Sequence, residues 1–303
     1  MTVSYYKKAV IGLILANIIW GMGPPIFKWS FQDVPPLTVA FFRFLIPVIL
    51  LLPFIKHIQP IRIRDGFYVV LLGLMNISLN IGLYFIGLQY TASINQPVIA
   101  SSEPILILLG SAIFLHDRAN KRTLFGNLVG LTGILFIVLQ PVLMATNIYS
   151  SFLGNCLFIG STISAAIGTI VAKKLTKRYS AITLLFWTFL IATISFLPVP
   201  FEEISHHTFL IHLTWQGLTG ILFGGLISSF LGYGLFYYGL HAIKTSEITI
   251  FQYVDPITAM LIAAPLLHEY PSPLFLLGTF LVFFGIFVAE GRIHWHPLHL
   301  LLK

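Results

Sequence analysis

Two stretches decide how this chain folds: SSEPILILLG at residues 101–110 and YVDPITAMLI at residues 253–262. In each stretch an acid stands before a proline within an apolar run, as Glu103-Pro104 and again as Asp255-Pro256. Proline removes a hydrogen bond from a helix interior, and an acid is unfavourable in apolar surroundings unless it has a partner. An unfavourable feature that occurs twice points to an internal repeat.

The composition is typical of a membrane protein. Of the 303 residues, 57% are hydrophobic and 9% are charged, whereas an ordinary soluble domain has about 25% charged residues. Apolar segments of about 20 residues, the length that crosses the hydrocarbon layer as a helix, follow one another along the chain. The first follows Lys7 and Lys8 and continues past any cleavage point typical of a signal peptide, so it predicts an uncleaved span.

Hydropathy and the charged or Pro/Gly-rich breaks predict an all-α polytopic membrane protein with ten transmembrane helices. The predicted spans are about 9–29, 37–55, 67–88, 94–115, 122–140, 151–172, 180–200, 214–240, 246–267 and 272–290. An even number of spans places both termini on one side. Most of the 17 basic residues fall on that side, and this bias predicts cytoplasmic termini and a multi-pass protein of the inner or plasma membrane. Because it also explains the net charge of +7, we expect no nucleic-acid partner.

The chain aligns with itself. A shift of 152 residues superimposes Glu103-Pro104 on Asp255-Pro256 and keeps six further pairs in register: Gly82 with Gly234, Gly87 with Gly239, His116 with His268, Asp117 with Glu269, Gly126 with Gly278, and Gly133 with Gly285. Earlier in each half a shift of 145 pairs Lys28 with Lys173. Five spans per repeat is an odd number, so the second copy is inverted, a plan common among secondary transporters. We expect repeats at 1–145 and 146–291 and a cytoplasmic or interfacial tail at 292–303.

At the level of motifs the chain resembles the drug/metabolite transporter superfamily, in particular its EamA type with two five-helix repeats. The resemblance covers nearly the whole chain and is carried by NIIWG (17–21) with Lys28, FFRFL (41–45), SSEPILILLGSAIFLHD (101–117), and YVDPITAMLIAAPLLHE (253–269). It implies a secondary active transporter of small organic metabolites, often an exporter, that works by alternating access. The family pattern ends spans four and nine with a glutamate after a small residue or glycine, whereas this chain has "HD" and "HE" there.

The two acids are the first candidates for substrate binding or coupling. Helical spacing places Gln96 on one face with Glu103, and Gln252 on one face with Asp255, and we expect both faces to look inward. An intramembrane acid is a functional hypothesis by default, here proton exchange or binding of a substrate amine. The alternative is a buried acid that stays protonated or pairs with a polar neighbour and only fixes packing.

Arg43 lies about six residues into the second span, roughly 9 Å from its outer end at 1.5 Å per residue. It is a candidate to bind a substrate carboxylate or to pair with Glu103 when the pore closes. The alternative is that its long side chain reaches back to the outer headgroups. Lys28, at the end of the first span, is interpreted as such an anchor.

Polar stripes on three spans complete the candidate site. They contain Asn80 and Tyr84 in span three, Tyr233 and Tyr237 in span eight, and Asn17 and Trp20 in span one. Such side chains can line a pore or join helices by hydrogen bonds, and Trp20 fits an interior packing role equally well. The glycines of LFGGLISSFLGYG (222–234) favour close helix contact over ligand binding.

Other activities leave no motif in this chain. No Walker sequence, HExxH motif or cysteine partner for a metal is present, so we expect no cofactor, no metal and no ATP-driven step. A facilitative exchanger resembling nucleotide-sugar or sugar-phosphate carriers is the main alternative. A membrane-embedded enzyme lacks a nucleophile clustered with a base, and a membrane scaffold is the remaining option. The expected partners are a small metabolite, the bilayer and, as an option, protons, with the chain a monomer or weak homodimer.

Overall fold

The computed structural model describes residues 3–106, 121–145, 148–200, 213–240 and 249–290, and these contain helices and no strand. The first half has α1 (Val3–Ser30), α2 (Pro36–Leu51), η1 (Leu52–His57), α3 (Ile63–Leu72), η2 (Gly73–Leu79), α4 (Asn80–Tyr90), α5 (Asn95–Ala100) and α7 (Lys121–Leu143). The second half has α8 (Ile148–Leu175), α9 (Ala181–Phe196), α11 (Trp215–Leu222), η3 (Phe223–Leu231), α12 (Gly232–Leu240), η4 (Thr249–Tyr253), α14 (Val254–Leu267) and α15 (Pro273–Glu290). The predicted all-α class is therefore confirmed.

Seven of these helical stretches are long and apolar enough to cross a membrane: Tyr6–Ser30, Pro36–His57, Ile63–Tyr90, Lys121–Leu143, Tyr149–Leu175, Ala181–Pro200 and Trp215–Gly239. Two shorter apolar helices, Phe251–Leu267 and Pro273–Ala289, occupy the positions predicted for the last two spans. The span predicted at 94–115 is described only as far as residue 106. The count of ten spans and the inverted repeat remain predictions, and the tail at 292–303 lies outside the described residues.

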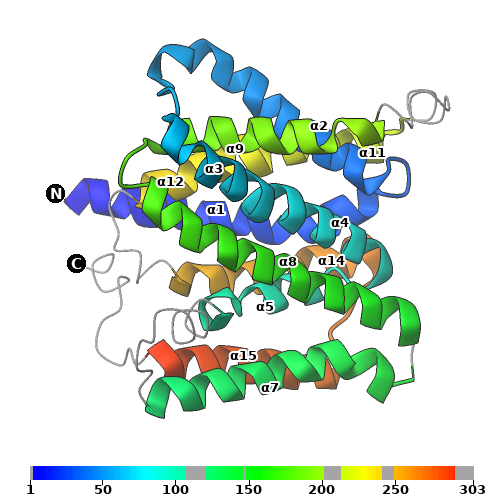
Figure 1. Cartoon of the computed structure of the whole chain (residues 1–303). Helices are drawn as coiled ribbons and strands as arrows, with labels where there is room; N and C mark the ends of the chain where they lie inside the picture. The colour runs from blue at the N-terminus through cyan, green and yellow to red at the C-terminus, as the bar shows by residue number, and fades with distance from the viewer. Residues whose placement is uncertain (1–2, 107–120, 146–147, 201–212, 241–248, 291–303) are drawn as a thin grey trace.

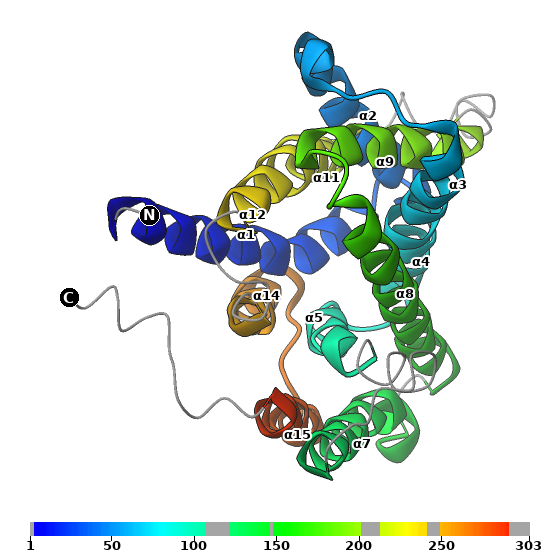
Figure 2. The ribbon, with the colours of Figure 1, turned by 60° about the vertical axis from the view of Figure 1, so that its left-hand side comes forward.

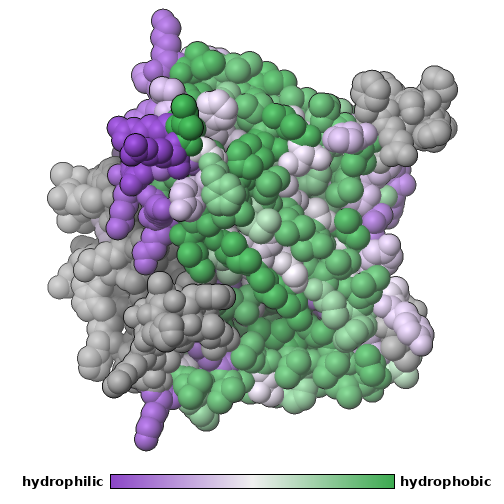
Figure 3. All heavy atoms as spheres, in the orientation of Figure 1, coloured by the Kyte–Doolittle hydropathy of each residue, from purple (hydrophilic) through white to green (hydrophobic). Residues whose placement is uncertain are grey.

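The long helices lie roughly side by side, and α1 crosses the bundle from the N-terminus at the left of Figure 1 to Ser30 at the right. We call the end of the bundle where α1 ends the distal end. Figure 3 shows a broad apolar surface between hydrophilic groups at the two ends, most strongly hydrophilic at the end of the N-terminus. An apolar band with polar margins is the surface that a bilayer requires of a spanning bundle.

Helices α7 and α15 form a closely packed pair at the lower edge of Figures 1 and 2. The glycines that the internal alignment matches face one another across this pair. A Cβ atom added at Gly133 would lie 2.5 Å from the carbonyl oxygen of Gly278, and one added at Gly126 would lie 2.5 Å from that of Gly285. Small residues allow such close backbone contact between membrane helices, so these positions are explained by packing.

The spans at 63–90 and 215–240 are each interrupted at the same place. A π-helical segment, η2 in one and η3 in the other, separates two α-helical parts. The shift of 152 residues that relates the two acid–proline pairs carries most of η3 onto η2. Extra residues of this kind inside a helix change the direction in which the following side chains point and occur often at functional sites.

Both acid–proline pairs begin a helical segment instead of lying within one. Helix α5 ends at Ala100, a turn follows at 101–102, and a new helical turn starts at Glu103. The 3-10 helix η4 likewise precedes α14, in whose first turn Asp255 and Pro256 lie. Proline is tolerated there because the backbone N–H groups of the first turn have no acceptor within the helix, so none is lost when proline lacks an N–H. The expectation of a proline in a helix interior is therefore corrected: a turn precedes Glu103, and a change from 3-10 to α-helix precedes Asp255.

Candidate functional site

Arg43 lies in the middle of the buried core. Its residue is 5% exposed, and its guanidinium carbon lies 4.9 Å from the ring centroid of Phe27, 5.5 Å from that of Phe44 and 5.6 Å from that of Phe85. A guanidinium over aromatic faces is stabilised by cation–π attraction. The interpretation in which Arg43 reaches back to the headgroups is therefore wrong, because the aromatic rings enclose its head.

The hydrogen bonds of Arg43 go to the π-helical segment of the second half. Its Nε donates to Ser229 Oγ and its Nη2 to Ser228 Oγ, both at 3.2 Å. Its buried Nη1 has no partner among the described residues. A buried cation with an unused donor is costly, and two neutral hydroxyls do not balance its charge. The arrangement therefore provides a place where an anionic group would be stabilised.

Aromatic side chains from three helices surround this cation. Tyr84 on α4 is 5% exposed and packs edge-on against Phe85, with ring centroids 5.0 Å apart. Trp20 on α1 lies 5.2 Å from Tyr233 and donates from Nε1 to the carbonyl oxygen of Ser228 at 3.0 Å. Both tyrosines lie within electrostatic range of Arg43. The structure thus brings together four predicted residues from four different spans.

Glu103 lies in the helical turn that follows α5 and contacts α8. Its Oε1 accepts a hydrogen bond of 2.7 Å from Thr169 Oγ1 on α8, and it lies within electrostatic range of Tyr233. Within the described part of the chain no ion pair joins it to Arg43, so the pairing considered from the sequence is not formed in this conformation. Tyr233 stands in range of both charges.

Asp255 faces α1. A Cβ added at Gly21 would lie 2.5 Å from the backbone oxygen of Asp255 and 2.8 Å from Thr258 Cβ. The glycine of the NIIWG motif therefore serves the contact between α1 and α14. The buried Oδ1 of Asp255 has no hydrogen-bond partner among the described residues. The two acids are matched in sequence but differ in contacts, because among the described residues Glu103 accepts a hydroxyl hydrogen bond and Asp255 does not.

The remaining predicted residues fall into two groups. Asn17 is fully buried and donates to Leu13 O at 2.7 Å, while Asn80 accepts from Ser161 Oγ at 2.6 Å and so joins α4 to α8. These contacts favour a helix-joining role over pore lining for Asn80. Gln96, Gln252 and Tyr237 are half-buried, and their part in a site stays a prediction. The described residues contain no group of three or more side chains able to hold a metal ion.

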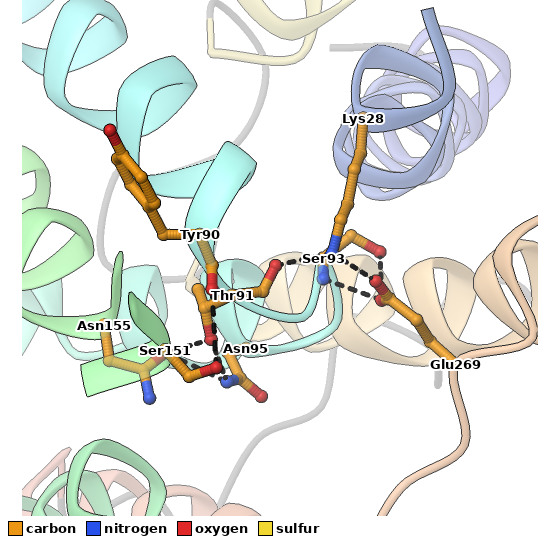
Figure 4. Close-up of polar contacts among 8 residues, drawn as sticks. All are labelled: Lys28, Tyr90, Thr91, Ser93, Asn95, Ser151, Asn155 and Glu269. Carbon is orange, nitrogen blue, oxygen red and sulfur yellow. Dashed lines mark hydrogen bonds and ion pairs between the residues drawn. The ribbon is translucent and has the colours of Figure 1, made fainter. Parts of the chain in front are cut away.

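A polar network at the distal end was missed by the sequence analysis. Lys28 Nζ contacts Glu269 Oε1 at 2.6 Å and donates to Thr91 O at 2.6 Å, and Ser93 donates to Glu269 Oε2 (Figure 4). Lys28 is therefore not the headgroup anchor that its position indicated. The only signal in the sequence was that a lysine and an acid, each with a repeat mate, stand at the ends of their spans.

Comparison with known proteins identifies the class of this molecule. The sequence model of the EamA-like transporter family matches residues 7–139 and again residues 152–290. The chain belongs to the EamA-like transporter family. Three relatives named as transporters match this EamA-like transporter over more than nine-tenths of its length.

The relatives have low sequence identity to this chain, but each match covers most of both chains. An "Uncharacterized transporter" of Archaeoglobus fulgidus is 28% identical, covering 94% of this chain and 99% of the relative. "Uncharacterized transporter YetK" of Bacillus subtilis is 26% identical, with 93% and 86% covered, and "Uncharacterized inner membrane transporter YhbE" of Escherichia coli is 25% identical, with 96% and 95% covered. These names denote transporters and not enzymes. The chain is thus a multi-pass membrane protein of a transporter family.

A solved structure shares the fold of this EamA-like transporter. It is titled "Crystal structure of protein", superimposes with a TM-score of 0.62 at 17% identity, and covers 93% of this chain and 97% of its own. The likeness extends over nearly all of both chains. At that identity it speaks for the fold alone.

Proposed function

We propose that this protein is a secondary active transporter that moves a small organic metabolite across the inner membrane by alternating access, in the direction of export. The observation that carries the proposal is Arg43, a buried cation whose Nη1 is unpaired among the described residues and whose surroundings are aromatic. A charged residue in that setting marks a substrate or ion pathway more often than a structural element.

Arg43 is the group that recognises an anionic part of the substrate, such as a carboxylate. The guanidinium binds a carboxylate through two parallel hydrogen bonds, and the unused Nη1 supplies one of them. Ser228 and Ser229 hold the side chain in place while the site is empty. The rings of Trp20, Tyr84 and Tyr233 offer an apolar surface for the body of the substrate.

Glu103 is the candidate for coupling. It lies in the same region as Tyr233, and an acid in the membrane interior can exchange a proton as access alternates between the two sides. Its bond from Thr169 can be made to either protonation state, because a hydroxyl both donates and accepts. In this proposal Glu103 exchanges protons and Arg43 binds the anionic group of the substrate.

The membrane arrangement belongs to the same proposal: ten spans, two inverted repeats at 1–145 and 146–291, and both termini in the cytoplasm. The bias of Lys and Arg between the predicted loops supports the orientation. The matched π-helical segments and the matched breaks before the acids support the repeat.

The test is uptake and counterflow in proteoliposomes with and without a pH gradient, screening amino acids, nucleosides and sugar phosphates. We expect Arg43→Lys to raise KM for an anionic substrate on the order of tenfold, the factor for about 1.4 kcal/mol, because lysine cannot form the paired bonds. We expect Glu103→Gln to remove the effect of the gradient. Arg64→Lys and Asp33→Asn are matched controls outside the core.

Unchanged flux in both core variants would refute the assignment of the site. Flux that depends on counter-substrate and ignores the gradient would favour the facilitative exchanger. The hydrogen bond from Thr169 supports that second candidate, since a carboxyl group held by a hydroxyl can also serve packing alone.

A further inference from the structure

The network at the distal end joins parts of the chain that are far apart in sequence. Lys28 is in the last turn of α1, whereas Glu269 follows α14 and lies 241 positions further along the chain. Ser93 and Thr91 come from the turn between α4 and α5. Figure 4 shows Lys28 and Ser93 reaching the carboxylate of Glu269 from two different elements, while the carbonyl oxygen of Thr91 accepts from Lys28.

Every oxygen of the Glu269 carboxylate is used. Oε1 contacts Lys28 Nζ at 2.6 Å, while Oε2 accepts from the backbone nitrogen of Ser93 at 2.7 Å and from its Oγ at 2.6 Å. The side chains of Lys28 and Glu269 are only 27% and 14% exposed. An exposed ion pair contributes little, but charge-assisted bonds that are partly shielded from water are stronger. This network therefore holds its three elements together effectively.

The same network continues into the neighbouring helices. Thr91 Oγ1 and Asn95 Nδ2 both donate to Asn155 Oδ1 on α8, each at 2.9 Å, and Asn155 Nδ2 donates to Ile137 O on α7 at 3.1 Å. Thr91 connects the contacts around Asn155 to those around Glu269, because its carbonyl oxygen accepts a hydrogen bond from Lys28 Nζ. At the distal end, helices of the first half are thus tied to α8 and to the end of α14.

We infer that Lys28, Glu269 and Ser93 form the gate that closes the distal side of the transport pathway. The inference rests on the proposed alternating access, in which one side must be closed while the other is open. The gate lies between the α4–α5 turn and the α14–α15 connection, the segments that precede and follow the two helices with acid–proline pairs. Opening at this end requires that Glu269 leave Ser93 and Lys28.

The test measures the conformation directly and needs no substrate. Spin labels at Gln89→Cys and Tyr270→Cys, both exposed at the distal end, report the separation across the contact between Ser93 and Glu269 in a Cys156→Ser background. We expect one short distance in the parent protein. Lys28→Gln and Glu269→Gln should each add a longer distance and raise the open-to-closed ratio on the order of tenfold, as expected for loss of a charge-assisted bond.

A charge-swapped variant, Lys28→Glu with Glu269→Lys, should restore part of the short distance, because the ion pair can form again while the bonds to Ser93 N and Thr91 O are lost. Arg178→Gln is the matched control: it breaks an ion pair of similar length, 2.7 Å to Asp65, outside the distal network, and should leave the distance unchanged. Where a single variant does not fold, Ser93→Ala keeps both charges and should give a smaller change in the same direction.

Unchanged distances in Lys28→Gln, Glu269→Gln and Ser93→Ala would overturn the gate and leave the network as static packing. A swap with no more of the short distance than either single-charge variant would also overturn it. Neither result depends on flux, so failure of the gate is distinguishable from failure of the proposed transport function, which the proteoliposome assay tests separately.

Discussion

At the scale of the single residue, His268 is one of two described non-glycine residues with a positive φ, the other being Ala145. It ends α14 in the left-handed region with φ 54°, and the next backbone nitrogen, that of Glu269, donates to Ala263 O at 3.3 Å. This turn directs Glu269 back toward Lys28 and Ser93. The resemblance to EamA-type sequences leads one to expect a glycine or small residue here, and the positive φ is the physical reason.

Replacing His268 with glycine tests this account. Left-handed geometry costs a residue with a side chain on the order of 1 kcal/mol, whereas glycine adopts it readily. We expect His268→Gly to raise the free energy of unfolding by up to about 1 kcal/mol and to keep the Lys28–Glu269 ion pair. Thermal unfolding in detergent measures the change. A lower unfolding temperature would show that the imidazole makes a contact more important than the backbone geometry.

At the scale of the element, the positions of glycines determine how closely neighbouring helices pack. Gly133 and Gly278 let α7 and α15 approach so closely that no side chain fits between them. Gly234 on α12 lies in the stretch predicted to serve close contact, yet a Cβ there would meet nothing within 4 Å. Gly225, in the same stretch, does fit that prediction, since a Cβ there would lie 2.6 Å from a methyl carbon of Ile46.

These two environments give a matched pair of substitutions. We expect Gly133→Ala to destabilise the protein by about 1–3 kcal/mol, because the new methyl group meets backbone that cannot move aside. Gly234→Ala should be neutral or stabilising by up to about 1 kcal/mol, because alanine favours the helix and has room. Thermal unfolding of both variants in one detergent measures the two changes. Equal changes in stability would mean that the close backbone contact at Gly133 does not limit packing of α7.

At the scale of the whole molecule, the placement of basic residues predicts which end faces the cytoplasm. The distal end carries Lys28 and Arg43 as the basic side chains nearest to it among the described residues, and both are engaged in contacts. At the other end Lys173, Lys174, Lys177 and Arg178 line a hollow of about 340 Å³. Bilayer insertion retains such clusters on the cytoplasmic side, so the distal end is expected to face outward.

Cysteine labelling tests this orientation in the Cys156→Ser background. We expect Tyr270→Cys, at the distal end, to react with a membrane-impermeant maleimide in intact cells. Lys56→Cys, on the exposed η1 segment, should react only after the membrane is opened. The reverse pattern would invert the molecule, place the proposed gate on the cytoplasmic side, and leave its chemistry unchanged.

The sequence by itself determined the helical class and the transporter family and marked Arg43 as a candidate, because composition, span length and motif spacing are properties of neighbouring residues. The matched glycines of α7 and α15 were visible in the same way. Periodicity also placed the acids on defined helix faces, although it could not show that each acid begins a new helical segment.

Only the tertiary structure shows which groups contact Lys28 and Arg43. Lys28 resembled a headgroup anchor because it stands at the end of its span, and its partner Glu269 stands 241 positions away. The aromatic enclosure of Arg43 likewise comes from three different helices, and its serine partners lie 185 and 186 positions away. A charge in a membrane is stabilised by whatever the fold brings within about 3 Å, and that proximity is set by how helices pack, not by the order of residues along the chain.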